Sequence, residues 1–220
     1  MVGVMDFDEV IDKRRTVRRF TSEDVPFENV KRIMEAGMKA PTWDHNRNWQ
    51  FVFLRTREEK ERAFKYAKSV VARFDERRYE GRSLSLSQEM YVYAMRYQYT
   101  MLVECPWVVV PLFRCNRLNA EWVSKLNPFA DAWCVVENML LAATNEGLGC
   151  SLRIPLNKEH DVVKEALGVP DGWMIPCFVG IGHPDPAEDL PKQYSTEVEG
   201  HIHFGSWKGE GLQTSLDTGW

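Results

Sequence analysis

Apolar residues near the start of the chain recur at helical spacing and predict two amphipathic helices. The first covers residues 5–14, where Lys13 and Arg14 lie at the C-terminal end that favours cations. The second begins at Pro26, because proline suits the first turn of a helix, and it ends before Pro41. The apolar stripes consist of Phe7, Val10 and Ile11 in the first helix and Val30, Ile33, Met34, Gly37 and Met38 in the second.

Four short segments have the pattern of β-strands. Residues 50–55 and 107–113 are rich in Val, Phe and Leu. The second of these runs is apolar almost without interruption, which is typical of a strand covered on both faces. We expect the other two strands over residues 150–154 and 173–182.

The segments between the strands predict further helices. Thr56 and Glu59 have the spacing of a capping box, which opens a helix expected to reach Phe74. Residues 129–147 are apolar almost all round and predict a central, buried helix. Other helices are expected over residues 88–104 and 157–167, and a loop over residues 116–128.

This interleaving of strands and helices predicts one α/β or α+β sandwich domain over residues 1–220. Residues 75–105 are expected to be a variable connector or lid, and residues 183–220 an extended C-terminal arm. Hydrophobic residues make up 44 % of the chain and charged residues 27 %, which is the globular range. The net charge of −4 argues against nucleic acid or an anionic membrane as the main partner, since both favour a basic surface.

Cysteine use indicates a reducing compartment. The cysteines are odd in number and form no CxxC pair, so we interpret them as buried thiols rather than a disulfide framework or a zinc site. The N-terminus has no secretory pattern, and no apolar run approaches the ~18 residues of a spanning helix. A cytoplasmic protein is therefore expected. The cysteines are Cys105, Cys115, Cys134, Cys150 and Cys177.

The basic segment, residues 13–20, holds most of the candidate chemistry. In extended backbone, alternate side chains face the same way. One face then holds Arg14, Thr16 and Arg18, and the other holds Arg15, Val17 and Arg19. Two guanidinium groups with a hydroxyl between them suit a phosphate dianion. The alternative is an exposed basic turn that pairs with surface carboxylates.

Other motifs are less informative. The sequence has no GxSxG, no P-loop and no GxGxxG between strand and helix, so a Rossmann-type dinucleotide site is not expected. His201 and His203 would form half of a metal site, but without neighbouring ligands we interpret them as solvated and expect no metal. The arginines of residues 73–82 are interspersed with acidic residues, which indicates an exposed helix end rather than an RNA surface. The tyrosines of residues 91–99 belong either to ordinary core and rim or to a lid over an aromatic ligand.

The order of several motifs is more specific than any one of them. The basic segment is followed by a helix that ends in Ala40-Pro41-Thr42, and then by Trp49-x-Phe51. The apolar helix ends in Ala142–Gly149, and a strand ends in Gly180-Ile-Gly182-His-Pro. In this order, the chain to about residue 195 resembles the nitroreductase-like family of FMN-dependent oxidoreductases. The resemblance favours the phosphate-binding interpretation of the basic segment.

The resemblance implies an α+β fold with a central, mainly antiparallel sheet, built as an intertwined homodimer with FMN at the interface. Carried over by position, Arg14, Arg15 and Thr16 hold the phosphate and ribityl end, and Lys192 is a late basic residue on the phosphate. Arg18 lies beside the pyrimidine side of the flavin, where a fixed cation stabilises the negative charge of the reduced ring.

The remaining implied contacts surround the isoalloxazine ring. Pro41, Thr42 and His45 reach it from the partner subunit, and the backbone of Leu152, Arg153 and Ile154 faces N5. Arg18, Arg153 and Ile154 are the candidates for a catalytic role. The family usually has small residues near N5, where this chain has Arg153-Ile154-Pro155. The run Ile154-Pro155-Leu156-Asn157, together with His45, is more similar to the iodotyrosine-deiodinase-like branch.

The activity implied by the resemblance is ping-pong reduction. NADH or NADPH reduces the flavin through N5 and leaves, and a small aromatic substrate (a nitroaromatic, a quinone or a halogenated phenol) then takes its place. Trp43, Trp49 and the tyrosines of residues 91–99 are candidates for the aromatic walls. Three alternatives stay open: an FMN-binding carrier or sensor without turnover, a reductive dehalogenase, and oxygen-dependent fragmentation of the flavin, as in the dimethylbenzimidazole synthase branch.

Overall fold

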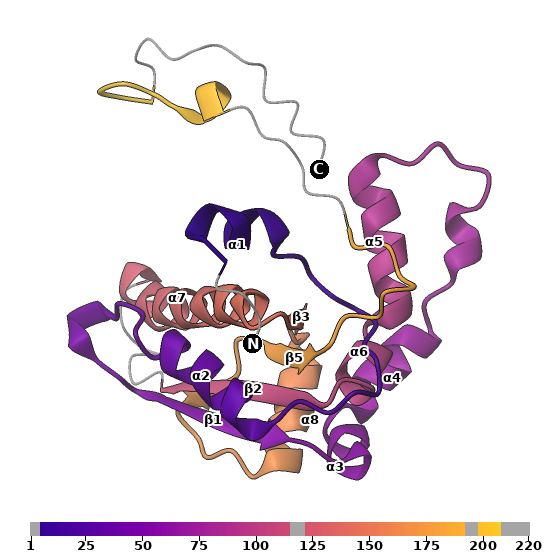
Figure 1. Ribbon diagram of the computed structural model, residues 1–220, viewed down its shortest axis with the longest axis horizontal. Helices are drawn as coiled ribbons and strands as arrows, with labels where there is room; N and C mark the ends of the chain where they lie inside the picture. The colour runs from indigo at the N-terminus through magenta and orange to yellow at the C-terminus, as the bar shows by residue number, and fades with distance from the viewer. Residues whose placement is uncertain (1–4, 115–121, 192–197, 208–220) are drawn as a thin grey trace.

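The computed structural model describes residues 5–114, 122–191 and 198–207, and strands within these ranges form one antiparallel sheet (Figure 1). The strands are β1 Trp49–Leu54, β2 Trp107–Arg114, β3 Gly149–Arg153, β4 Trp173–Met174 and β5 Phe178–Gly182. Their order is β1-β2-β5-β3, with β4 paired to β2. β3 is therefore an edge strand in this order, and the predicted α+β class with an antiparallel sheet is confirmed.

Helices cover both faces of the sheet. One face packs against α2 (Phe27–Gly37) and α7 (Trp122–Asn145). The other face packs against α3 (Arg57–Ala63), α4 (Lys65–Ala72), α6 (Thr100–Val103) and α8 (Asn157–Leu167).

The central strand β2 shows how the two layers arise. Alternate side chains of a strand point to opposite faces, and both faces of β2 are buried. The prediction of a strand covered on both faces is thus confirmed. Trp107, Val109 and Phe113 belong to the core beneath α2 and α7, whereas Val108, Val110 and Leu112 belong to the opposite core.

The helix predicted from Thr56 starts as expected but breaks early. The Glu59 amide donates to Thr56 Oγ1 at 3.2 Å, and the Thr56 amide donates to the Glu59 carboxylate at 2.9 Å, which completes the capping box. The helix does not reach Phe74, because α3 ends and α4 begins at Phe64. Phe64 is fully buried, with its ring centre 4.9 Å from that of Phe178. We infer that burying the Phe64 ring is more favourable than continuing one helix through this position. Such a tertiary effect cannot be predicted from the spacing of residues in the sequence.

Three other predicted elements differ in their boundaries. Residues 88–104 form two helices, α5 (Leu86–Tyr97) and α6. The strand predicted over residues 173–182 is divided into β4 and β5, and Pro176, which has no N–H for a sheet ladder, lies in the gap. The loop predicted over residues 116–128 is wrong from Trp122 onward, because α7 begins there and contains Pro128.

The predicted burial also needs correction at several positions. α7 is not buried all round, since Phe129 and Cys134 are exposed. Met38 is exposed at the end of α2, where the apolar stripe predicted burial. Cys105, Cys150 and Cys177 are buried as expected, and Cys115 lies outside the described residues.

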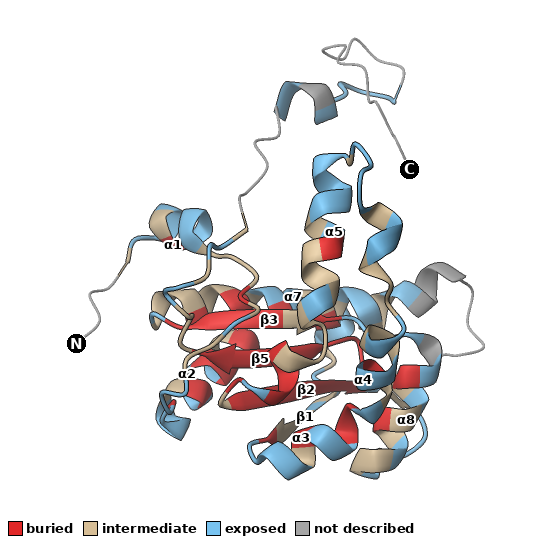
Figure 2. Cartoon of the chain, turned by 90° about the vertical axis from the view of Figure 1, so that its right-hand side faces the viewer, coloured by how far each residue is buried: buried red, intermediate tan, exposed pale blue. Residues whose placement is uncertain are grey.

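Two helical segments project from the sandwich (Figure 2). One is α1 (Phe7–Lys13), and the other is the helical hairpin, residues 75–97, which contains the 3-10 helix η2 (Glu76–Tyr79) and α5. A further 3-10 helix, η3 (Val198–His201), lies in the C-terminal arm. Within the described ranges, no helix has both the length and the apolar character needed to cross a bilayer.

Candidate functional site

The basic segment is held between edge strand β3 and the first residues of the C-terminal arm. Thr16 forms a parallel bridge with Cys150 of β3, and the Val17 amide donates to the Cys150 carbonyl at 2.8 Å. Further along, Phe20 forms an antiparallel bridge with Pro184. The sheet edge and the arm therefore fix the extended backbone on which the arginines lie.

Gly149 allows the basic segment to approach β3. A Cβ built on Gly149 would lie 2.4 Å from Val17 Cγ2, and Val17 is only 3 % exposed. We expect Gly149→Ala to displace the segment and to lower the free energy of unfolding by roughly 1–3 kcal/mol, the usual cost of overpacking. Chemical denaturation measures the loss. In the control variant Gly168→Ala, a Cβ meets no atom within 4 Å, so only the backbone cost of its φ of +63° remains. Wild-type stability for Gly149→Ala would contradict this account.

The first two arginines of the segment contact α1 and α7. Arg15 Nη1 donates to the carbonyl oxygens of Asp12 at 2.5 Å and of Arg14 at 2.8 Å, at the C-terminal end of α1, where a cation is favoured. Arg14 Nε lies 3.8 Å from Glu137 Oε1 on α7. Both arginines are half-buried, and their assignment to a phosphate stays a prediction.

Arg18 differs from its neighbour Arg19 in charge compensation. Arg19 pairs with Asp185 at 3.2 Å and with Glu188 at 2.9 Å. Within the described residues, Arg18 has no carboxylate partner, and its Nε is buried without a hydrogen-bond partner. Its guanidinium carbon lies 5.7 Å from the centre of the Tyr93 ring, and burial lowers the pKa of Arg18. A half-buried guanidinium without compensation is costly, which marks this position as a place for an acceptor or an anion.

The residues at the end of β3 have separate surroundings. Arg153 is buried, and its Nε and Nη2 donate to the two carboxylate oxygens of Glu159, each at 2.7 Å. Its Nη1 donates to Gln98 Oε1 at 2.6 Å. Leu152 is half-buried, whereas Ile154 is 61 % exposed. The Arg153 side chain therefore joins β3 to α8 and to the foot of α5, while its main chain pairs with Phe178 of β5.

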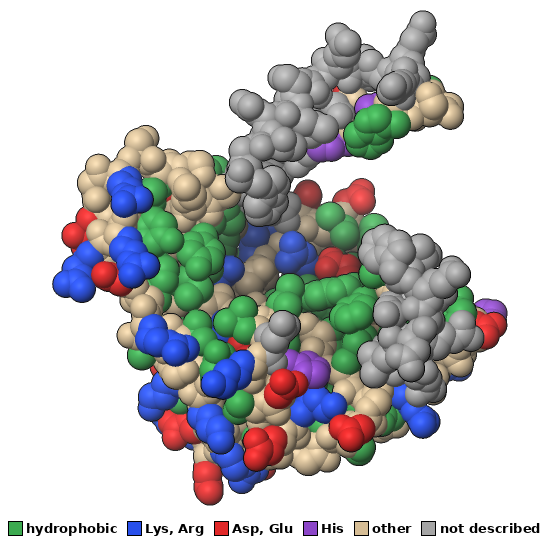
Figure 3. Space-filling view, turned by 180° about the vertical axis from the view of Figure 1, so that it is seen from behind, with side chains coloured by type: hydrophobic (Ala, Val, Ile, Leu, Met, Phe, Trp, Pro, Cys, Tyr) green, Lys and Arg blue, Asp and Glu red, His purple; other side chains and the backbone are tan. Residues whose placement is uncertain are grey.

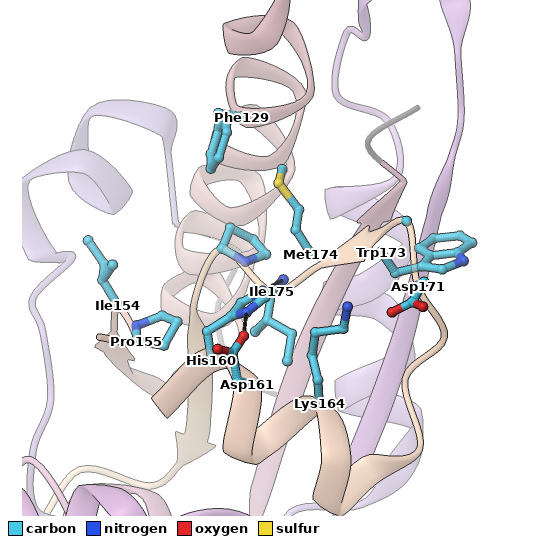
Figure 4. A pocket seen from close by; sticks show the side chains of 12 residues that line it. Phe129, Ile154, Pro155, His160, Asp161, Lys164, Asp171, Trp173, Met174 and Ile175 are labelled. Carbon is cyan, nitrogen blue, oxygen red and sulfur yellow. Dashed lines mark hydrogen bonds and ion pairs between the residues drawn. The ribbon is translucent and has the colours of Figure 1, made fainter. Parts of the chain in front are cut away.

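A largely apolar cavity of about 620 Å³ lies beside Ile154 (Figure 4). Its walls come from α7, α8 and the strand β4, and hydrophobic side chains gather on the face seen in Figure 3. His160 Nε2 accepts a hydrogen bond from the Ile175 amide at 3.2 Å, and His160 Nδ1 lies 3.1 Å from Asp161 Oδ1. The cavity is lined by Phe129, Ile154, Pro155, Trp173 and Met174 on its apolar side and by His160, Asp161 and Lys164 on its polar side.

The loop of residues 41–48 lies against α7. In its 3-10 helix η1 (Trp43–His45), the Trp43 amide donates to Asp131 Oδ1 at 2.7 Å, and burial raises the pKa of Asp131. Asp44 and His45 have φ values of 54° and 52°, a left-handed conformation that is strained for residues other than glycine. Of the residues predicted to reach a partner's flavin, Pro41 and His45 are exposed and Thr42 is half-buried.

Several polar residues of the site were missed by the sequence analysis. Glu159, Glu188 and Gln98 make the contacts described above, and no local motif distinguishes them from surface residues. Each has a partner that the fold brings from another element, so only an expected three-dimensional arrangement could have identified them. Within the described residues, no group of three or more His, Cys, Asp or Glu side chains could hold a metal ion. Lys192 lies outside the described residues.

The fold is thus an α+β sandwich with an arginine that lacks a carboxylate partner, within the described residues, beside its edge strand. The chain belongs to the Nitroreductase family, whose model matches residues 11–183. This confirms the resemblance that the motif order indicated. It also makes the protein a flavin-dependent oxidoreductase of the NAD(P)H nitroreductase type.

Individual relatives agree with this family. A protein of Methanothermobacter thermautotrophicus, inferred to be an NADH dehydrogenase/NAD(P)H nitroreductase, is 36 % identical over 210 residues, which cover 94 % of this chain and 90 % of the relative. A 4-nitrobenzoate reductase of Nocardioides sp. is 23 % identical over 228 residues, covering 90 % and 89 %. The crystal structure of an oxidised iodotyrosine deiodinase bound to FMN and 3-iodo-L-tyrosine has the same fold, with a TM-score of 0.70. Its sequence is 18 % identical, and the match covers 91 % of this chain and 99 % of the deiodinase chain.

Proposed function

We propose that this protein uses FMN to transfer electrons from NADH or NADPH to an electron-poor aromatic acceptor, such as a nitroaromatic, a quinone or a halogenated phenol. The observation that carries the proposal is the half-buried, uncompensated guanidinium of Arg18 beside edge strand β3. The relatives support the cofactor and the acceptor class, because they include nitroreductases and a deiodinase crystallised with FMN.

The residues of the site fit FMN. The pyrimidine edge of a flavin presents acceptor atoms, and Arg18 Nε is a buried donor without a partner. Arg14 and Arg15 add two cations for the phosphate, where guanidinium groups bind oxygen pairs. Bound FMN supplies the redox chemistry, since its isoalloxazine ring carries two electrons between the nicotinamide and the acceptor.

The roles of the chain's own residues follow from their positions. Arg14, Arg15 and Thr16, with Lys192, hold the phosphate and ribityl end. Arg18 stabilises negative charge at the pyrimidine edge. The main chain of residues 152–154 supports the N5 edge of the ring. The nicotinamide and the acceptor occupy the same face of the site in turn, so ping-pong kinetics are expected.

We include a homodimer in the proposal. Large apolar side chains on α1, on α7 and after β3 are exposed in the single chain, and a second subunit would bury them. The loop of residues 41–48 is fixed to α7 by Asp131 while it presents Pro41 and His45 outward. This arrangement suits residues that contact the flavin of a partner subunit. The exposed apolar side chains are Phe7, Ile11, Leu126, Phe129, Ile154 and Leu156.

The visible spectrum of the purified protein tests the proposal. We expect a yellow protein that bleaches when NADH or NADPH is added without oxygen and recovers its colour when a nitroaromatic or a quinone follows. Bleaching by dithionite alone would favour the dehalogenase or carrier alternative. A colourless protein that takes up no added FMN would refute the proposed site.

A further inference from the structure

Glu188 connects three parts of the chain that are distant in sequence. Its Oε1 accepts hydrogen bonds from the hydroxyls of Tyr93 at 2.7 Å and Tyr97 at 3.1 Å, both on α5. Its Oε2 accepts from Arg19 Nη1 at 2.9 Å. Because Glu188 lies at the start of the C-terminal arm, one carboxylate joins the helical hairpin, the basic segment and the arm.

The charge states of this cluster support the same geometry. The hydrogen bond from Tyr93 is the largest cause of a lowered pKa at Glu188. Burial, followed by the bond to Glu188, raises the pKa of both Tyr93 and Tyr97. At neutral pH, Glu188 is therefore an ionised acceptor and the tyrosines are protonated donors.

Within the described residues, the helical hairpin contacts the sandwich near the foot of α5, where Tyr97 packs against the core that contains Phe64 and Phe178. It projects from the sandwich, and Val92 is the buried residue of α5 (Figure 2). At the foot of α5, Gln98 is held by Arg153. Hydrogen bonds to a charged group are stronger than neutral ones, so we expect those to Glu188 to add substantially to this packing in docking the hairpin.

The tyrosine held by Glu188 also contacts Arg18. The Tyr93 ring lies under the Arg18 guanidinium, at 5.7 Å from the ring centre, within the range of a cation–π interaction. The position of Tyr93 thus affects where the Arg18 charge lies, although Glu188 itself pairs with Arg19.

We propose that Glu188 is a positioning residue for the oxidoreductase reaction. It docks residues 75–97 against the basic segment through Tyr93 and Tyr97, and it thereby fixes the guanidinium of Arg18 where the flavin ring is bound. The second step rests on the proposed function, whereas the docking step is a property of the chain without FMN.

Hydrogen exchange of the FMN-free protein tests the docking step. In Glu188→Ala, we expect the amides of residues 86–97 to exchange at least about tenfold faster than in the wild type, because both hydrogen bonds from α5 to the carboxylate are lost. Glu61→Gln is the control, since it removes an exposed ion pair between Glu61 and Arg57, which both lie on α3 and away from α5. Tyr93→Phe removes a single hydroxyl and carries the same test if Glu188→Ala does not fold. Unchanged exchange in α5 would overturn the docking.

Anaerobic reduction of the FMN-loaded protein by NADH tests the positioning step. We expect Glu188→Ala to lower the reduction rate at saturating NADH about tenfold, and to have no further effect when Arg18→Ala is already present. A purely structural role for Glu188 would instead give the same loss in both backgrounds and would overturn the positioning step, as would an unchanged rate despite faster exchange. A wild-type protein that binds no FMN would refute the proposed function, while the exchange result would still decide the docking.

Discussion

Replacing Arg18 with alanine is expected to lower the rate of flavin reduction by NADH or NADPH roughly 10²–10³-fold, the range seen when one preorganised donor to a developing negative charge is removed. FMN should remain bound, because other residues hold its phosphate in the proposed site. Removing Arg18 takes away a costly uncompensated charge, but it also removes the contacts of that side chain with the Tyr93 ring and the Thr16 carbonyl. Because these effects oppose each other, the free energy of unfolding of the FMN-free protein should be nearly unchanged. Stopped-flow reduction and chemical denaturation measure these two effects separately.

Arg14→Ala is the matched control for this experiment. It removes a guanidinium from the same segment but, in the proposed site, from the phosphate end. We therefore expect FMN affinity to fall about tenfold or more, with a smaller effect on the reduction rate once FMN is saturating. Equal FMN affinity for the wild type and Arg14→Ala would remove the phosphate assignment. An unchanged reduction rate in Arg18→Ala would remove the assignment of Arg18 to the flavin ring.

Features of the fold that depend on local chemistry could be predicted from the sequence. The Thr56–Glu59 capping box is an example, because both partners lie within one helical turn. The apolar run of β2 similarly predicted a strand covered on both faces, since burial on both faces leaves no polar position. The break at Phe64 could not be predicted, because the residues around it carry no break signal and the buried contact of Phe64 with Phe178 lies far along the chain.

The candidate site divides in the same way. The sequence identified the basic segment and the side chains that share a face when it is extended, but it did not predict the contrast between Arg18 and Arg19. That contrast arises because Asp185 and Glu188 of the arm are placed beside Arg19 by the pairing of Phe20 with Pro184. For Arg153, the sequence indicated a departure near N5, whereas the structure shows where its side chain lies: in a buried ion pair with Glu159. An arginine at this position thus serves the fold through its side chain.

Loss of the Arg153–Glu159 pair is expected to have the largest effect on stability. Both side chains are buried, at 6 % and 0 % exposure, and the guanidinium binds the carboxylate through two hydrogen bonds. Removing one partner leaves a buried charge without compensation, which typically costs about 3–5 kcal/mol. We therefore expect Arg153→Met to lower the free energy of unfolding of the FMN-free protein by about that amount, measured by chemical denaturation.

The reason for this large effect can be tested with the double variant Arg153→Met/Glu159→Leu, which removes both charges together. Replacing a buried ion pair with apolar residues of similar volume is often nearly neutral, so the double variant should recover most of the loss. Arg57→Met is the control, because it breaks an exposed pair with Glu61 and should cost less than about 1 kcal/mol. If Arg153→Met and Arg57→Met cost the same, the pair does not anchor β3 to α8. If the double variant is no more stable than Arg153→Met, the loss comes from packing around Arg153, and the foot of α5 is held by the shape of that side chain rather than by its charge.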